Sequence, residues 1–122
     1  MQEARQIAQQ QHRPVLLNFS GSDWCGPCIL LRKEIFDAPE FSAFADTALV
    51  LVNADFPRMK KHQLSKEQQQ ENDRLADQYN PQGKFPLTLL LNAEGKVLQQ
   101  WEGLPPVGSA AFSLQVKAAI DK

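Results

Sequence analysis

The sequence is poor in cysteine and histidine, with two residues of each in a chain of 122. A zinc site needs about four ligands, and His12 and His62 lie far from the cysteines, without the spacing of metal ligands. Haem attachment through a Cys-X-X-Cys motif needs a histidine directly after the second cysteine, and here Ile29 follows Cys28. We therefore expect neither a metal nor an organic cofactor.

Excess charge and long apolar runs are also missing. A net charge of -1 offers no electrostatic footprint for nucleic acid or an anionic membrane surface. No apolar run approaches the roughly 18–20 residues of a membrane span, so we expect a soluble protein. Residues 1–13 hold no apolar core like that of a signal peptide. Two interpretations of the compartment stay open: a cytoplasmic protein, or an exported protein whose signal segment is not part of this sequence.

The length and the apolar content suit a single domain over residues 1–122, which we expect to be a monomer. Apolar runs and helical spacing place the elements. The predicted strands are 15–19, 48–52, 87–91 and 96–101, the first three buried; the predicted helices are 2–11, 25–36, a short one around 41–45, 60–79 and a last one through 112–120. These elements predict an α/β fold with a mixed, mostly parallel sheet of about four strands, flanked by helices, whose antiparallel edge strand follows a hairpin turn.

The run Trp24-Cys25-Gly26-Pro27-Cys28 follows a buried strand and a turn, at the start of a predicted helix. Unpaired N–H groups and the helix dipole at that place favour a thiolate on Cys25. At such positions the pKa of a cysteine falls from about 8.5 to roughly 3.5–7.5. Cys28 lies about one helical turn further, roughly 5–6 Å away between Cα atoms, where it can resolve a mixed disulfide.

The residues around the two cysteines fit the same chemistry. Pro27 suits the first helical turn, where its missing N–H has no partner to lose. Gly26 leaves the approach to Cys25 open, and Trp24 offers a flat apolar surface to an extended substrate. The alternative is a static disulfide or two buried thiols, which a Cys-X-X-Cys pair alone does not exclude.

Phe85-Pro86 directly precedes a predicted buried strand. Proline is tolerated at the first position of such a strand. A cis bond there would expose the Phe85 backbone for pairing with a substrate strand, whereas trans is the usual form of such bonds. The pattern of residues alone leaves both forms open.

The pentapeptide at 24–28 matches the active site of thioredoxins, and Phe85-Pro86 falls where that family has its cis-proline. The resemblance covers most of the chain, from Val15 through the last helix, and implies a three-layer thioredoxin-like fold. It implies that Cys25 is the nucleophile, Cys28 the resolving thiol, Pro86 a cis-proline beside them and Gly103 a glycine that lets backbone approach.

Two departures from thioredoxins concern charge. Thioredoxins pair a buried Asp before the motif with a Lys of the next strand, and Asn18 and Leu51 take those positions here. The joint loss avoids an unpaired buried charge, but it removes the carboxylate that would help to deprotonate Cys28. Asp23 and Glu34 are alternative proton carriers, although both fit solvated surface acids as well.

Other departures concern length. The first strand of thioredoxin is missing, and 57–72 adds a helical insertion before the proline, capped by Ser65 with Gln68. Segments 33–41 and 50–55 resemble the thioredoxin-like C-terminal domain of periplasmic thiol:disulfide interchange reductases and related stand-alone bacterial proteins. This resemblance favours an exported, periplasmic protein that keeps other thiols reduced.

The leading hypothesis is therefore a protein-disulfide reductase that contributes to cell redox homeostasis. Its partners would be protein disulfide substrates and an upstream thiol reductant. An oxidase or isomerase of the same fold is possible, because the potential depends on thiolate stabilisation. The alternative from another class is a binding module that docks a partner on the 60–79 helix and on a surface of Trp24, Phe85 and Trp101. That helix also fits a solvated insertion, and Trp101 a packing role.

Overall fold

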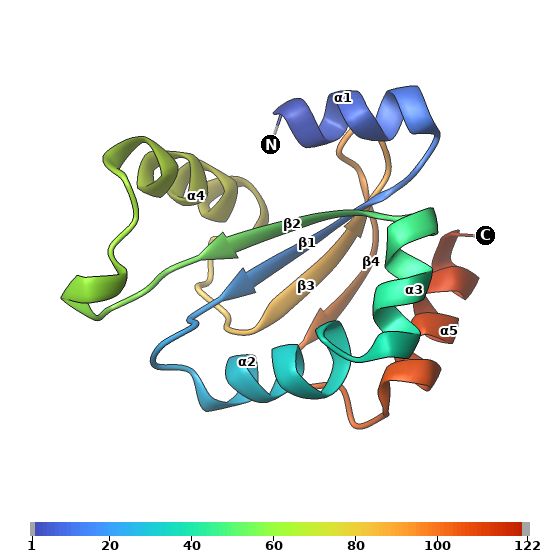
Figure 1. Ribbon diagram of the computed structural model, residues 1–122. Helices are drawn as coiled ribbons and strands as arrows, with labels where there is room; N and C mark the ends of the chain where they lie inside the picture. The colour runs from blue at the N-terminus through green and yellow to red at the C-terminus, as the bar shows by residue number, and fades with distance from the viewer. Residues whose placement is uncertain (1, 121–122) are drawn as a thin grey trace.

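A computed structural model describes residues 2–120 as a four-stranded sheet covered by helices on both faces (Figure 1). The strands run in the order β2-β1-β3-β4. They are β1 (Val15–Ser20), β2 (Val50–Asp55), β3 (Leu87–Leu91) and β4 (Val97–Glu102). The helices are α1 (Gln2–Gln11), α2 (Gly26–Leu31), α3 (Pro39–Ala48), α4 (Lys66–Tyr79) and α5 (Ser109–Ile120), with a π-helical turn at Arg32–Phe36 and a 3₁₀ turn at Lys60–His62.

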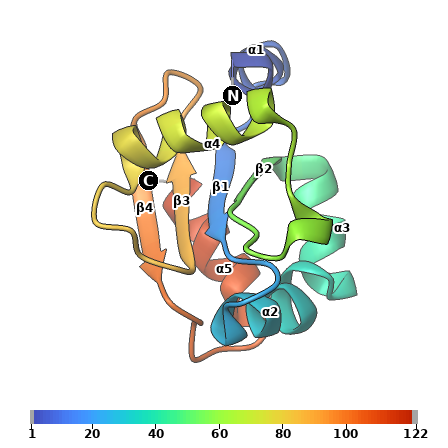
Figure 2. The same cartoon turned by 90° about the vertical axis from the view of Figure 1, so that its left-hand side faces the viewer.

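Strand β1 is buried on both faces and separates two hydrophobic cores. Its side chains alternate between the faces, as strand geometry requires. Leu16 packs into the core under α2, α3 and α5, whereas Leu17 and Phe19 pack into the core under α1 and α4. Figures 1 and 2 show these two groups of helices on opposite sides of the sheet. The α/β class and the helix-covered sheet predicted from the sequence are confirmed.

The strand directions correct one part of the prediction. The sheet is mixed, but the antiparallel strand lies inside it rather than at its edge: β1 is parallel to β2, and β3 is antiparallel to both β1 and β4. The reason is the course of α4, which crosses the strands instead of running back along them (Figure 2). The chain therefore enters β3 at the end of the sheet where β1 and β2 finish.

The second strand was predicted as a buried strand over 48–52, and this is wrong. Helix α3 continues to Ala48, and β2 begins only at Val50. As an edge strand, β2 buries Ala54 but leaves Leu51 55% exposed. An apolar run read by itself does not distinguish an edge strand from a central one.

Helix α4 has the cap and the thin contact face expected from the sequence, but it begins at Lys66 rather than at Lys60, because Ser65 caps it there and a separate 3₁₀ turn precedes it. Ser65 Oγ accepts a hydrogen bond from the Gln68 N–H at 3.1 Å. Leu75 is buried, and the Tyr79 hydroxyl donates to the Gly95 carbonyl at 2.7 Å. Among residues 2–120, none of the helices combines the length and the apolar character that a membrane span requires.

Candidate functional site

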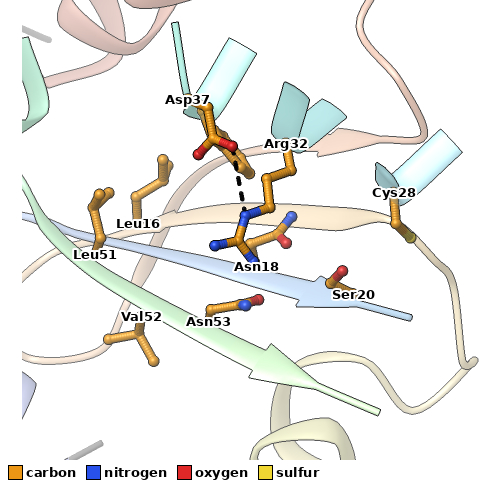
Figure 3. A pocket seen from close by; sticks show the side chains of 10 residues that line it. Leu16, Asn18, Ser20, Cys28, Arg32, Asp37, Leu51, Val52 and Asn53 are labelled. Carbon is orange, nitrogen blue, oxygen red and sulfur yellow. Dashed lines mark ion pairs between the residues drawn. The ribbon is translucent and has the colours of Figure 1, made fainter. Parts of the chain in front are cut away.

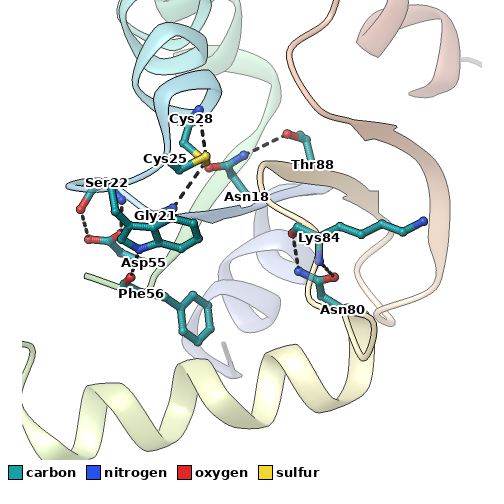
Figure 4. Close-up of a disulfide and its surroundings, with 11 residues drawn as sticks. Asn18, Gly21, Ser22, Cys25, Cys28, Asp55, Phe56, Asn80, Lys84 and Thr88 are labelled. Atoms are coloured by element: carbon teal, nitrogen blue, oxygen red, sulfur yellow. Dashed lines mark hydrogen bonds between the residues drawn. A yellow bond between two sulfur atoms is a disulfide. The ribbon is translucent and has the colours of Figure 1, made fainter. Parts of the chain in front are cut away.

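Cys25 and Cys28 form a disulfide where the chain leaves β1 and begins α2 (Figure 4). Their Cα atoms are 5.2 Å apart, within the range expected from the motif spacing. Cys25 is the N-cap of α2, and its sulfur accepts a hydrogen bond from the Cys28 N–H at 3.3 Å. The Gly21 N–H points at the Cys28 sulfur from 3.5 Å. Backbone donors thus face both sulfurs, and they favour negative charge there.

The turn before the disulfide sets the place of Cys25. The Trp24 and Cys25 N–H groups both donate to the Gly21 carbonyl, at 3.3 and 2.9 Å. Pro27 then lies in the first turn of α2, as predicted. A Cβ atom on Gly26 would have no atom within 4 Å, so the approach beside Cys25 is open.

An aromatic row lies beside the disulfide and consists of Trp24, Phe85 and Phe56. The Phe85 ring meets both of the other rings edge to face, each at a centroid distance of 5.4 Å. The Trp24 indole N–H donates to the Phe56 carbonyl at 2.7 Å, which fixes the ring. The row gives the disulfide a rigid apolar flank.

The Phe85-Pro86 bond is cis, as the resemblance implied. The Pro86 carbonyl accepts a hydrogen bond from the Gly103 N–H at 2.9 Å. Gly103 has a φ of 73°, a backbone conformation that glycine adopts without strain. A Cβ atom there would meet no atom within 4 Å, so the backbone angle, and not a lack of space, accounts for a glycine at this position. Within residues 2–120, the Phe85 backbone has no hydrogen-bond partner.

Trp101 does not share a surface with Trp24 and Phe85, contrary to the docking hypothesis. It packs on Phe112 at a centroid distance of 5.1 Å and belongs to the core under α5. Phe85 packs against the core on the opposite face of the sheet. Trp101 therefore has a packing role, while the other two aromatics flank the disulfide.

A cavity of about 230 Å³ lies under Cys28, between β2 and the helix that carries the motif (Figure 3). Asn18 and Leu51, at the positions of the thioredoxin charge pair, both line it. Asn18 is 9% exposed, and its side-chain N–H donates to the Thr88 hydroxyl at 3.0 Å. Arg32 and Asp37 also line the cavity, and their ion pair is solvent-exposed. The buried surroundings of Cys28 are thus polar but uncharged.

Asp23 is occupied by contacts away from both cysteines. Its carboxylate accepts the Arg58 and Met59 N–H groups at 2.9 and 3.0 Å, and the His62 Nδ1 at 3.0 Å. The backbone hydrogen bond from Arg58 is the main cause that lowers the pKa of Asp23 below its ordinary value, against an opposing effect of burial. Glu34 is exposed on the π-helical turn. Neither carboxylate is hydrogen-bonded to a cysteine.

Sequence reasoning missed the segment that meets Asp23. Residues 57–63, here called the basic strap, follow β2 and contain Arg58, Lys60 and Lys61. The Arg58 guanidinium lies 3.7 Å from the Trp24 ring centroid. The run of cations was visible in the sequence, but its place beside Trp24 follows from the carboxyl ends of β1 and β2 meeting at one edge.

Asp55, also unforeseen, closes the same edge. Its carboxylate accepts the Ser22 N–H at 3.0 Å and the Ser22 hydroxyl at 2.6 Å. In residues 2–120, no three His, Cys, Asp or Glu side chains converge as metal ligands would. The arrangement is therefore a two-cysteine site with a rigid apolar and cationic flank.

A dithiol–disulfide pair at a helix N-terminus, with an adjacent cis-proline on a mixed sheet, defines the class of thioredoxin-fold thiol–disulfide oxidoreductases. The family model described as "Thioredoxin-like domain" matches residues 1–113. The chain therefore belongs to the thioredoxin-like family.

The comparisons with individual proteins are consistent with this class. Disulfide bond reductase DsbH of Chlamydia pneumoniae is 42% identical over 118 residues, which cover 97% of this chain and 69% of that protein. Thioredoxin-related protein DsbJ of Chlamydia pneumoniae is 35% identical over 94 residues, covering 76% of this chain but only 26% of DsbJ. A solved structure of a DsbH oxidoreductase superposes with a TM-score of 0.88 at 40% identity, over 98% of this chain and 80% of that one.

A more distant solved structure shares the fold. The C-terminal domain of Neisseria meningitidis DsbD in its oxidised form matches with a TM-score of 0.64 at 17% identity, over 96% of this chain and 90% of that chain. The homology and the paired Cys25 and Cys28 give this chain the redox function of thioredoxin-fold proteins.

Proposed function

We propose that this chain is a protein-disulfide reductase with Cys25 as its nucleophile and Cys28 as its resolving thiol. The observation that carries the proposal is the place of the Cys25 sulfur, at the N-cap of α2 with the Cys28 N–H directed at it. In the dithiol form this donor and the helix dipole stabilise a Cys25 thiolate. The homology to a protein named a disulfide bond reductase favours the reducing direction.

The first step forms a mixed disulfide. The Cys25 thiolate attacks one sulfur of a substrate disulfide; a new S–S bond joins Cys25 to the substrate, and the old S–S bond breaks. The other substrate sulfur leaves as a thiolate, which takes up a proton from solvent. The open space at Gly26 leaves room for the approach.

The second step releases the reduced substrate. Cys28 gives up its proton, and its thiolate attacks the Cys25 sulfur of the mixed disulfide. The second substrate sulfur leaves as a thiolate, and the Cys25–Cys28 disulfide forms. The substrate has gained two electrons and, after protonation, two protons. With Asn18 and Thr88 beneath it, Cys28 has no buried carboxylate to receive its proton, so we assign that proton to solvent in the open cavity.

Completion of the cycle needs a partner that supplies two electrons. An upstream thiol reductant attacks the Cys25–Cys28 disulfide by the same exchange chemistry and restores the dithiol. The exchange uses sulfur atoms alone, so no metal or organic cofactor takes part in it. The partners are thus protein disulfides on one side and a thiol reductant on the other.

Substrate contacts fall to the residues around the sulfur atoms. Trp24 and Phe85 would pack on apolar side chains, and the free backbone of Phe85 beside Pro86 would pair with an extended substrate strand. Gly26 and Gly103 would leave room for the backbone of that strand, and Pro27 would contact it from the first turn of α2.

We extend the proposal to the cellular compartment, the domain organisation and the oligomeric state. The similarity to DsbH, and the resemblance to periplasmic interchange reductases, favour an exported, periplasmic protein over a cytoplasmic one. The two cores share one sheet, which supports a single domain over 1–122, of which 2–120 are described. We propose that this domain acts as a monomer.

The test is the reduction of insulin disulfides by the dithiol form, with Cys25→Ser and Cys28→Ser as controls. Turnover that both substitutions abolish is expected, together with a potential well below that of glutathione when the two are equilibrated. Absence of turnover in the wild-type protein, or a Cys25–Cys28 disulfide that stays oxidised in excess thiol, would refute the reductase function. In that case a partner that binds the Cys25→Ser variant unchanged would indicate a docking module.

A further inference from the structure

Positive charge gathers in one connection next to the disulfide. The basic strap carries Arg58, Lys60 and Lys61, and no acidic residue lies between Asp55 and Glu67. The chain as a whole has a net charge of -1. The excess of cations is therefore a local property of this segment.

The strap is fastened to the active-site loop. Asp23 accepts the backbone N–H groups of Arg58 and Met59 and the His62 Nδ1, and Trp24 Nε1 donates to the Phe56 carbonyl at the start of the strap. The Arg58 guanidinium lies over the Trp24 ring, 3.7 Å from its centroid. Because Trp24 directly precedes Cys25, these contacts hold the strap beside the disulfide.

The strap's own charges are not neutralised by neighbouring acids. Arg58, Lys60 and Lys61 are exposed, and none forms an ion pair with a carboxylate among residues 2–120. The side chain of Asp23 is 5% exposed and bonds to backbone N–H groups and to His62. Arg58 therefore meets solvent against Trp24, and Lys60 and Lys61 carry two further exposed charges in the same strap.

A shallow hollow of about 570 Å³ joins the strap to the aromatic row. It is lined by Trp24, Phe56, Pro57, Arg58, Gly83 and Phe85. Trp24, Phe56 and Phe85 give this hollow an aromatic lining, and Arg58 adds a positive charge to it. A chain segment that crosses Phe85 beside the cis-proline would lay neighbouring side chains into this hollow and against the strap.

We propose that the strap and the hollow select protein disulfides whose attacked cysteine has acidic residues within a few positions of it. This inference rests on the reductase function proposed above and names its substrate class. Attraction between exposed charges extends about 8 Å at physiological ionic strength, so only residues close to the substrate cysteine experience it. Such complementarity acts mainly on association and weakens as salt is added.

The experiment uses three synthetic peptides that carry one cysteine in the same mixed disulfide with a chromogenic thiol. Matched flanking positions hold Glu, Gln or Lys. Rates with the dithiol protein are divided by rates with dithiothreitol, which removes differences in intrinsic reactivity. At low salt we expect the second-order rate constant of the dithiol protein with the Glu peptide to exceed that with the Lys peptide about tenfold, with the difference shrinking at about 0.5 M salt.

Two double variants locate the preference. Lys60→Gln with Lys61→Gln removes two charges of the strap; Lys96→Gln with Lys117→Gln removes two exposed charges from the hairpin turn and α5. We expect the first variant to lose most of the Glu-over-Lys ratio and the second to keep it. Equal ratios in the two variants would overturn the proposal.

The Gln peptide separates the two levels of inference. If wild type reduces this peptide but shows no preference for Glu over Lys, the strap proposal fails and the reductase function stands. If wild type reduces none of the three peptides, the reductase function itself fails.

Discussion

The two sides of the Cys25–Cys28 disulfide differ in how they hold charge. On the substrate side, Asp23 holds the strap by backbone hydrogen bonds, and the cationic side chains remain in water. Beneath Cys28, the buried position next to the sulfur carries Asn18, bonded to a neutral Thr88 hydroxyl. The strap keeps its charges exposed to solvent, whereas the buried side chains beneath Cys28 are neutral.

The difference follows from the cost of desolvation. A buried carboxylate needs a close partner, and removing one member of a buried pair is strongly destabilising. With Leu51 in place of a lysine, the cation that lines the cavity with Asn18 is Arg32, which is largely exposed and already paired with Asp37, so an acid at position 18 would gain little from it. Exposed cations need none, so the strap can carry several. The strap can therefore keep its cations in solvent, while the buried position beside Cys28 holds a neutral side chain.

The largest expected effect comes from charging the inner side. Asn18→Asp would place a carboxylate next to Thr88 at a position that is only 9% exposed, so its pKa should rise by roughly two units, which corresponds to about 3 kcal/mol of stability at pH 7. A raised folded-state pKa costs nothing below about pH 4, where the acid is protonated in both states. Urea unfolding of wild type and variant at pH 7 and at about pH 4 measures this. Equal losses at the two pH values would contradict it.

A second substitution sharpens that result. Leu51 lines the same cavity. In the Asn18→Asp background, Leu51→Lys should therefore raise the free energy of unfolding by at least about 1 kcal/mol, whereas in wild type it should change that free energy little. The measurement is a double-mutant cycle of unfolding free energies at pH 7. Additive effects of the two changes would show that the cavity does not couple these positions.

A smaller effect is expected from crowding the substrate side. In Gly21→Ala the new Cβ would overlap the Trp24 indole, which Phe56 and Arg58 hold in place. We expect a loss of about 1–2 kcal/mol by thermal or urea unfolding, from overpacking.

Gly26→Ala is the matched control, because its Cβ meets no atom within 4 Å. It should keep or raise stability, by up to about 1 kcal/mol as a helical alanine. It should nevertheless slow insulin reduction, since the methyl group would occupy the approach to Cys25. A stable Gly21→Ala would show that Trp24 is less firmly held than its contacts imply.

The smallest effect on overall stability concerns the attachment of the strap. The pKa of Asp23 is lowered, so its contribution is present at neutral pH and is lost as pH falls through that lowered value, below about pH 4. Hydrogen exchange should give the Arg58 and Met59 amides high protection factors at pH 7, and these should fall once acid protonates Asp23. Asp23→Asn keeps one acceptor oxygen, so one of these amides should exchange faster already at pH 7. Unchanged protection of both in the variant would contradict the proposed anchor.

Local patterns in the sequence predicted much of the fold. The motif at 24–28 placed Cys25 at the start of a helix, and Ser65 with Gln68 marked the cap of α4. Each depends on residues within one turn of each other, where spacing alone determines geometry. The cis form of Phe85-Pro86 needed the resemblance to thioredoxins as well, because its residues permit both forms.

Features that depend on residues far apart in the sequence could not be predicted from local patterns. Leu51 is apolar, yet it lies on an edge strand whose exposure depends on the sheet order. Trp101 and Phe85 lie on opposite faces of the sheet, which their spacing does not reveal. Asp23 and Arg58 are 35 positions apart and meet only because two strands end side by side.

The central claim is that Cys25 is the sulfur that binds substrate, and the direct test is to trap that intermediate. Reduced Cys28→Ser protein is mixed with an activated peptide disulfide and analysed by mass spectrometry after proteolysis. We predict a lasting adduct on Cys25, because the resolving thiol is gone, and no lasting adduct on wild type. An adduct that forms equally well on Cys28 of the Cys25→Ser variant would contradict the assignment, as would the absence of any adduct on Cys25.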